Sequence, residues 1–247
     1  MTPEEVRASA AHLFELHQRY APLFGYPQAQ NHALTYLRGL LQHEGHKNAE
    51  AMALTVGAGQ VRPLQQFLAD SPWDHRGVLQ QIQADFVNTL VPSTSEWDVG
   101  TVGVFDESGF PKKGKHSVGV ARQWCGRLGK KDNCQVGVYL VGVAPAGTAL
   151  LEHQLYLPEE WILDQKRRRA AGIPRSITFR TKPQLALDLL ARVQAAGVVS
   201  LDWLTFDELY GRNEDFLAQL EQRQKLYVGE VPVSTTVWRK DPATQIP

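Results

Sequence analysis

Two aspartates, Asp106 and Asp207, each follow a short apolar run that is typical of a buried strand, residues 99–105 and 203–206. In open α/β sheets, functional groups gather at strand ends, where rigid backbone meets a cleft. If the two strands are neighbours, the carboxylates share one edge and repel each other unless a proton or a cation lies between them. Mg²⁺ prefers such oxygen ligands, and two ions can support phosphodiester chemistry. The spacing therefore predicts a candidate metal site.

A structural role for these acids is the alternative. Acidic residues often cap strands and helices, and Asp207 also precedes a segment that reads as a turn. The residue types and spacing alone leave the structural and the metal-binding interpretation open.

Basic residues gather in two places. Residues 111–131 (PKKGKHSVGVARQWCGRLGKK) hold many lysines and arginines and no acid, and residues 166–169 (KRRR) form a second cluster. A solvated surface explains one such cluster well. Two clusters beside a candidate anion-processing site favour phosphate binding instead, although the balance of 26 Lys+Arg against 26 Asp+Glu excludes a uniformly basic coat.

The first ninety residues are predicted to be helical. Thr2, Pro3 and the acids after them form a helix start, and apolar residues then recur at three- and four-residue spacing. Further helices are expected around 34–41, 47–56, 61–68 and 74–90. The helix–glycine–helix pattern over 47–68 is compatible with a DNA-reading helix-turn-helix and equally with the corner of any helical bundle.

Residues 92–95 read as a linker, after which the apolar period changes to that of strands. Strands are expected over 99–105, 117–122 and 135–143 as an antiparallel meander. A helix at 184–196, a strand at 203–206, a helix at 213–224 and a strand at 226–231 follow. This order predicts an α/β fold with a mixed sheet.

Composition restricts the class of protein and the cellular compartment that we expect. With 247 residues, 43% hydrophobic and 21% charged, the chain is of ordinary globular type. Cys125 and Cys134 are too few for a disulfide framework and are expected to be free, partly buried thiols in a reducing cytoplasm. No run is long and apolar enough to cross a membrane, and the acidic N-terminus does not resemble a secretory signal.

Several ordered motifs resemble those of bacterial insertion-sequence transposases of the DDE superfamily of endonucleases. The sharpest is residues 104–123 (VFDESGFPKKGKHSVGVARQ). The others are 133–138 (NCQVGV), 155–161 (LYLPEEW), 167–174 (RRRAAGIP), 181–183 (TKP) and 207–212 (DELYGR). The resemblance spans about residues 30–232 and implies a ribonuclease H-like catalytic domain over 97–247. An all-α, DNA-binding region is expected over 1–92.

The resemblance also implies a chemistry. The family's triad of two Asp and one Glu binds two Mg²⁺ ions, for which Mn²⁺ can substitute, and Asp106 and Asp207 match the two aspartates. The reaction is hydrolysis at transposon ends followed by attack of the freed 3′-OH on target DNA. The implied partners are insertion-sequence ends and target DNA, with a homodimer or larger assembly associated with the nucleoid. The basic residues expected to contact DNA are Lys112, Lys113, Lys115, Arg122, Lys130, Lys131, Arg167 and Arg168.

One departure from the family pattern concerns the third acid, a Glu on a helix well downstream of the second Asp. The candidates after Asp207 are Glu208, Glu214, Asp215, Glu221, Glu230 and Asp241. None has a suitable helical setting, and Asp241 is followed directly by Pro242. We therefore expect the third acid to be absent, the catalytic domain to be C-terminally incomplete with exposed apolar surface, and the activity to be impaired.

Three broader hypotheses follow. The first is a metal-dependent transposase, the second a truncated transposase-derived protein that binds DNA without cleaving it, and the third an α/β protein with structural acids and no DNA affinity. His116, Trp124 and Trp161 have open roles: the histidine could contact phosphate or be solvated, and the tryptophans could be core residues or stack on a base.

Overall fold

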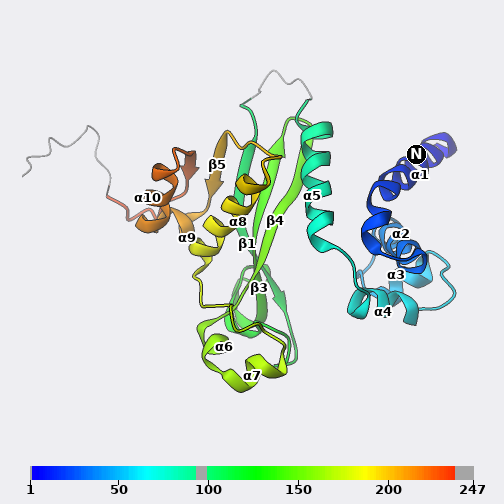
Figure 1. The fold of residues 1–247 in the computed structure, drawn as a ribbon, viewed down its shortest axis with the longest axis horizontal. Coiled ribbons are helices and arrows are strands. Elements are labelled where there is room, and N and C mark those ends of the chain that lie inside the picture. Colours follow the sequence, from blue (N-terminus) through cyan, green and yellow to red (C-terminus); the bar gives the residue numbers. More distant parts are fainter. Residues whose placement is uncertain (1, 93–98, 237–247) are drawn as a thin grey trace, which may run out of the picture. The chain divides into compact units, whose positions relative to one another are not determined.

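A computed structural model describes residues 2–92 and 99–236 (Figure 1). The chain divides into two compact units, Met1–Gln81 and Ile82–Pro247, and the division falls inside helix α5 (His75–Asp85). The expected linker lies largely outside the described residues, so the domain limits at 92 and 97 stay a prediction.

The first unit is helical, as expected from its apolar periodicity. Its helices are α1 (Pro3–Tyr20), α2 (Pro27–Gln42), α3 (Ala49–Thr55), α4 (Arg62–Asp70) and the first part of α5. Thr2 and Glu5 form a capping box that satisfies backbone amides at the start of α1. Small residues of α2 and α3 pack against Leu64 and Phe67 of α4.

Helices α3 and α4 are joined by a turn in which Gly57 and Gly59 adopt positive φ angles of 67° and 71°. Glycine enters this left-handed region without the clash that a Cβ atom causes. The helix–glycine–helix pattern is therefore confirmed, whereas its use in reading DNA stays a prediction.

The second unit is built on a mixed sheet, as the order of predicted elements indicated. Its strands are β1 (Val102–Pro111), β2 (Ala121–Cys125), β3 (Lys130–Ala144), β4 (Gly147–Tyr156), β5 (Trp203–Phe206) and β6 (Leu226–Gly229). Strand β3 pairs antiparallel with β1, β2 and β4, whereas β5 lies parallel to both β1 and β6. The strands run in the order β2-β3-β1-β5-β6, and β4 pairs with β3 over Val136–Ala144, beyond the part that pairs with β2; this arrangement fits a ribonuclease H-like fold.

One face of this sheet carries the core. Helix α8 (Lys182–Ala196) packs on β3 and β4, and α10 (Glu214–Gln222) packs beside α8 (Figure 1). A π-helical turn, Phe86–Leu90, extends α5 and covers β4 on the same face. The largest buried side chains of this core are Phe86, Phe105, Leu140, Leu151, Leu189, Leu190, Leu204, Tyr210, Phe216 and Leu220.

Three strand predictions need correction. Strand β1 does not end before Asp106 but continues to Pro111, because β3 pairs with it along that whole length. The strand expected over 117–122 is displaced to β2, since residues 117–119 turn and Gly119 has a φ angle of +76°. The expected meander is also wrong, because β3 lies between β1 and β2.

Strand β4 and the short helices α6 (Glu159–Leu163) and α7 (Gln165–Ala170) were not predicted. Strand β4 contains Glu152, which is only 4% exposed because the Arg192 guanidinium lies 3.0 Å from its carboxylate. A charged residue in the buried part of a strand hides the alternation on which sequence reasoning depends.

Cys125 and Cys134 are free and buried, as expected. Burial, followed by the neighbouring Cys125, raises the pKa of the Cys134 thiol to about 11. In the part of the chain that the structure describes, no helix has the length and apolar character needed to cross a membrane.

Candidate active site

Asp106 and Asp207 occupy equivalent positions on neighbouring parallel strands. The β1–β5 ladder ends with the pair Phe105↔Phe206; Asp106 is the next residue of β1, and Asp207 follows the last residue of β5. Phe105 and Phe206 are buried on the helical face, whereas Asp106, on the alternate face, is exposed. The sheet therefore places the two predicted acids together at the end of the β1–β5 ladder.

Each carboxylate is held through one oxygen. Asp106 Oδ1 accepts a hydrogen bond from the Glu107 amide at 2.7 Å, and Asp207 Oδ1 accepts one from the Leu209 amide at 3.0 Å. Asp207 thereby caps the short helix α9 (Glu208–Gly211), so the structural alternative holds for one of its oxygens. Among the described residues, neither Oδ2 atom has a hydrogen-bond or ion-pair partner.

This donor set is suited to a hard cation. Mg²⁺ is commonly held by one or two carboxylates and completes its octahedron with water and substrate phosphate oxygens. Asp106 and Asp207 supply two such carboxylates with an oxygen free on each. Within residues 2–92 and 99–236, no group of three or more His, Cys, Asp or Glu side chains could hold a metal ion.

The acids considered as a third ligand lie elsewhere. Glu208, Glu214 and Asp215 are exposed in the first turns of α9 and α10. Glu221 Oε1 accepts a hydrogen bond from the Tyr227 hydroxyl at 3.1 Å. Glu230 is exposed just beyond β6, and Asp241 lies outside the described residues.

The sheet face that carries Asp106 also presents apolar side chains. Trp203 of β5 pairs with Leu226 of β6, and the next outward pair along these strands includes Val228. Leu226 is 57% exposed and Val228 66% exposed. In the described part of the chain this face therefore exposes apolar side chains, whereas the expected C-terminal incompleteness of the domain stays a prediction.

The basic loop after β1 borders a cleft of about 500 Å³. Its lining residues are Lys113, Lys115, Val120, Ala121, Arg122, Asn133, Glu160 and Arg167. Lys113, Lys115 and Arg122 are exposed, and their charged groups make no hydrogen bond or ion pair with any described residue. These three cations are free to meet an anion.

Helices α6 and α7 hold that loop in place. The buried Trp161 ring donates from Nε1 to the Val120 carbonyl at 2.8 Å, and the Arg167 guanidinium stacks 3.5 Å above the same ring. Arg167 also donates to the Lys115 carbonyl at 2.9 Å. Trp161 is therefore a core residue, whereas Trp124 is 52% exposed.

The other residues predicted to contact DNA differ in their exposure and in whether their charges are already paired. Lys112 is half-buried, His116 and Lys131 are exposed, and Lys130 forms an ion pair with Asp132 at 3.1 Å. Arg168 is only 7% exposed, and its guanidinium donates to the carbonyls of Ile162, Pro174 and Ile177. We therefore assign Arg168 to the packing of the 162–177 segment and leave it out of the proposed DNA surface.

Replacing Arg168 tests this structural role. Arg168→Ala leaves buried carbonyl groups without donors, so it is expected to lower the free energy of unfolding by about 2–4 kcal/mol. Arg122→Ala, the matched exposed control, is expected to change it by less than about 0.5 kcal/mol. Urea unfolding followed by circular dichroism measures both, and equal losses would contradict the assignment.

Behind Asp106, Glu107 points to the helical face and meets two partners. The Lys182 ammonium donates to Glu107 Oε1 at 2.6 Å, and the Tyr210 hydroxyl donates to Oε2 at 3.2 Å. Burial, followed by the charge of Glu107, raises the pKa of Tyr210 well above its ordinary range, and the charges of Asp207 and Asp106 add to the shift. Of the three carboxylates, that of Glu107 contacts the hydroxyl directly. Sequence reasoning did not find this cluster.

This shift predicts an alkaline loss of stability. The unfolded tyrosine ionises near pH 10, whereas the folded one stays protonated, so its contribution is complete below about pH 10 and falls as the pH rises further. The advantage of the wild type over Tyr210→Phe is expected to shrink by about 1.4 kcal/mol per pH unit above that point. Urea unfolding at pH 8 to 11 measures it, and a constant difference would argue against the shift.

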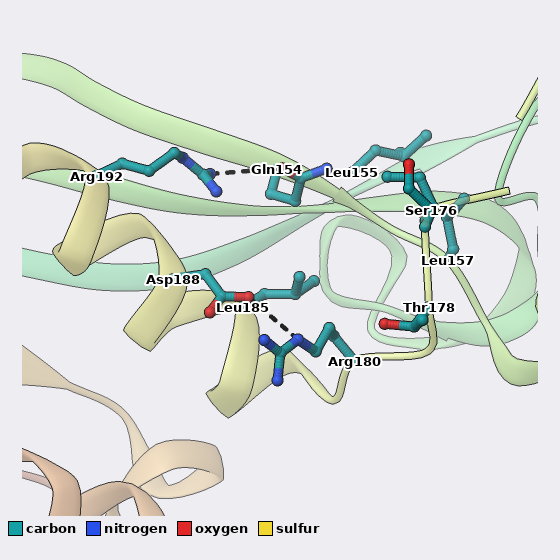
Figure 2. A pocket seen from close by; sticks show the side chains of 10 residues that line it. Gln154, Leu155, Leu157, Ser176, Thr178, Arg180, Leu185, Asp188 and Arg192 are labelled. Carbon is teal, nitrogen blue, oxygen red and sulfur yellow. Dashed lines mark hydrogen bonds and ion pairs between the residues drawn. The ribbon is translucent and has the colours of Figure 1, made fainter. Parts of the chain in front are cut away.

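A second cleft, of about 290 Å³, lies between α8 and β4 (Figure 2). Arg180 and Asp188 form an ion pair at 3.4 Å beside it, and Arg192 reaches toward Gln154. Neither Asp106 nor Asp207 lines this cleft, so we place no part of the candidate active site there.

The fold is that of a ribonuclease H-like nuclease, and comparison with known protein families identifies the same class of protein. Residues 19–247 match the family described as DDE superfamily endonuclease, and the chain belongs to that family. It is similar to the "Probable transposase for insertion sequence element IS701" of Microchaete diplosiphon, with 29% identity over 198 residues. That alignment covers 79% of this chain and 47% of the relative, so the chain spans about half the length of the curated relative.

Proposed function

We propose that this chain carries the catalytic aspartates of a DNA transposase that cleaves and joins strands at insertion-sequence ends. The observation that carries the proposal is the placement of Asp106 and Asp207 directly after the last pair of the β1–β5 ladder. Each has one oxygen fixed by a backbone amide and one left free. Membership of the DDE superfamily and similarity to an insertion-sequence transposase support the reaction class.

Two Mg²⁺ ions, or Mn²⁺ in their place, would supply an activated water and stabilise the leaving oxygen at a phosphodiester. The chain's own contribution is to orient the two carboxylates that would bind these ions. The amides of Glu107 and Leu209 fix the rotation of the two carboxylates, so each free oxygen faces a defined direction before DNA arrives. Such preorganisation avoids rearrangement during the reaction. The same pair of acids would serve hydrolysis at the element end and the later attack of the 3′-OH on target DNA.

The DNA backbone is proposed to run over the cleft beside the basic loop. Lys113, Lys115 and Arg122 offer unpaired positive charge there, and the contacts of Trp161 and Arg167 keep their backbone fixed. Such contacts position a duplex without reading its sequence. Lys112 and Lys131 extend the same surface. Two copies, one on each element end, would act together on the nucleoid.

Salt dependence tests this surface. Each phosphate contact that is lost should reduce the slope of log Kobs against log salt by about 0.9. Lys113→Ala, Lys115→Ala and Arg122→Ala are each expected to lower the slope by about that amount, with weaker binding to every sequence. Lys225→Ala is the control. Lys225 directly precedes β6, so it lies at the amino end of the parallel β5–β6 pair, whereas Asp207 lies at its carboxyl end. Equal slopes for all four variants would contradict the proposed DNA path.

A second candidate function is DNA binding without nuclease activity. It is favoured by the lack of a three-acid group among the described residues and by the exposed apolar face beside Asp106. If the chain serves as a transposase, we propose that its cleavage is impaired, because residues 2–92 and 99–236 place no third acid in a group with Asp106 and Asp207.

A nicking assay separates the two functions. The substrate is a supercoiled plasmid carrying the element ends, with Mg²⁺ or Mn²⁺ and with the Asp106→Asn chain as the control. Slow nicking that Asp106→Asn abolishes supports the transposase. Salt-sensitive binding with no nicking at any metal concentration supports the DNA-binding function. If the chain fails to bind DNA at low salt, both are wrong.

A further inference from the structure

Glu107 joins three elements at the edge where the catalytic acids lie. It comes from β1, Lys182 from the first turn of α8, and Tyr210 from α9. The side chains of Glu107 and Lys182 are each 16% exposed, and Tyr210 is fully buried. A carboxylate that is so enclosed and receives two donors has one orientation, because leaving either donor or the charge unpaired in the interior is costly.

The Glu107 cluster lies just past the point where the backbone pairing of β1 with β5 stops. The backbone pairing of β1 with β5 stops at Phe105↔Phe206, one residue before each aspartate. Beyond that point, Glu107 follows Asp106 directly, and the Tyr210 amide donates to the Asp207 carbonyl at 3.2 Å. The hydrogen bond from Tyr210 to Glu107 therefore links the segment bearing Asp106 to the segment bearing Asp207.

We propose that Glu107 is a positioning residue that fixes the separation of the Asp106 and Asp207 carboxylates through Tyr210, with Lys182 as its anchor. The inference rests on the proposed function, since it concerns how that site is kept in shape. Glu107 is not itself a metal ligand in this arrangement, because side chains alternate along β1 and its carboxylate lies on the face opposite Asp106.

Lys182 has a second effect, on charge. Glu107 directly follows Asp106 and would otherwise add a third negative charge near the two aspartates. The ammonium at 2.6 Å compensates that charge and holds Glu107 on the helical face. Loss of Lys182 is therefore expected to release Glu107 and loosen the segments that bear Asp106 and Asp207.

Mn²⁺ affinity distinguishes positioning from plain structural support. Electron paramagnetic resonance of free Mn²⁺ gives the dissociation constant for each variant of the full chain, and urea unfolding gives its stability. Tyr210→Phe keeps the ring packing and removes only the link, and is expected to weaken Mn²⁺ binding about 10- to 100-fold, as the loss of a partner that orients a metal ligand does. Glu107→Ala is expected to have a similar effect.

Two controls make the result specific. In Glu107→Gln the amide oxygen can still accept from Tyr210, so its Mn²⁺ affinity is expected to lie between those of the wild type and Glu107→Ala. Val193→Ala opens a small cavity at the far end of α8, where Val193 is buried, and is expected to lower stability with unchanged Mn²⁺ affinity. Variants of Glu107 and Tyr210 that bind Mn²⁺ as the wild type does, or no worse than Val193→Ala, would overturn the proposal.

The failure of this inference differs from failure of the proposed function. If Asp106→Asn abolishes Mn²⁺ binding while Tyr210→Phe leaves it intact, the metal site stands and the positioning role is wrong. If the wild type shows no Mn²⁺ binding that depends on Asp106, the proposed function fails and the positioning role fails with it.

Discussion

Replacing either Asp106 or Asp207 with asparagine is expected to lower the affinity of the chain for Mn²⁺ by at least about 100-fold, because even partners that only orient a ligand contribute about 10- to 100-fold. Each substitution removes one negative charge and one carboxylate from a pair that shares a sheet edge. Asparagine keeps the oxygen that accepts from the backbone amide of Glu107 or Leu209, so the local hydrogen bonds can survive. Isothermal titration with Mn²⁺ measures the affinity directly.

The control for this prediction is Asp215→Asn, which removes the same charge from an exposed residue in the first turn of α10. Its Mn²⁺ affinity is expected to change by less than about twofold, because an exposed charge away from the site is screened by salt. Similar losses in all three variants would mean that Mn²⁺ responds to net charge and not to a site. Full affinity in Asp106→Asn or in Asp207→Asn would exclude that residue as a ligand.

Replacing Phe216 with alanine is expected to lower the free energy of unfolding by about 3–5 kcal/mol, as large-to-small changes of buried aromatic residues do. Phe216 is 1% exposed, and its ring packs at centroid distances of 5.9 Å from Phe105 and 5.1 Å from Phe206. Those two rings directly precede Asp106 and Asp207, so α10 supports the backbone just before each aspartate. The midpoint of urea unfolding measures the loss.

Phe110→Ala is the matched control, since Phe110 lies on the same strand as Phe105 and is 43% exposed. It is expected to cost less than about 1 kcal/mol, because little apolar area leaves the core. If both variants lose stability equally, the packing of Phe216 against Phe105 and Phe206 does not stabilise the core as described.

Local patterns predicted most of the helices and, among the described strands, all but β4, although β1 was expected to be shorter and β2 was expected over 117–122. The caps at Thr2 and Gly197 and the spacing of apolar residues identify α1 and α8 without tertiary information. Strand β4 could not be found in this way, because the buried Glu152 is paired with Arg192, forty residues along the chain. The length of β1 likewise depends on β3, which pairs with it past Asp106.

The candidate site likewise has a part that local sequence patterns predict and a part that depends on residues far apart in the chain. The proximity of Asp106 and Asp207 follows from two apolar runs ending in acid, and the parallel ladder confirms that the strands are neighbours. The Glu107 cluster joins residues 75 and 103 positions apart, which no local pattern can reveal. A signal did exist in the alternation of β1, since Glu107 shares the face of Phe105 and therefore points inward.

Arg168 illustrates the limit of reasoning from charge. It stands in a run of four basic residues that reads as a solvated or DNA-facing cluster. Helix α7 turns its side chain inward, where the carbonyls of Pro174 and Ile177 accept its hydrogens. Membership of a charged run therefore does not establish exposure, because helical geometry sends successive side chains in different directions.

The most direct test is a crystal of the chain grown with Mn²⁺ and examined for anomalous scattering beside Asp106 and Asp207, just past the last pair of the β1–β5 ladder. We predict an ion bound by carboxylate oxygen from both Asp106 and Asp207, with water completing its coordination. The peak should disappear in crystals of Asp106→Asn. Mn²⁺ bound only elsewhere, or bound at this edge by just one of the two aspartates, would contradict a shared metal site.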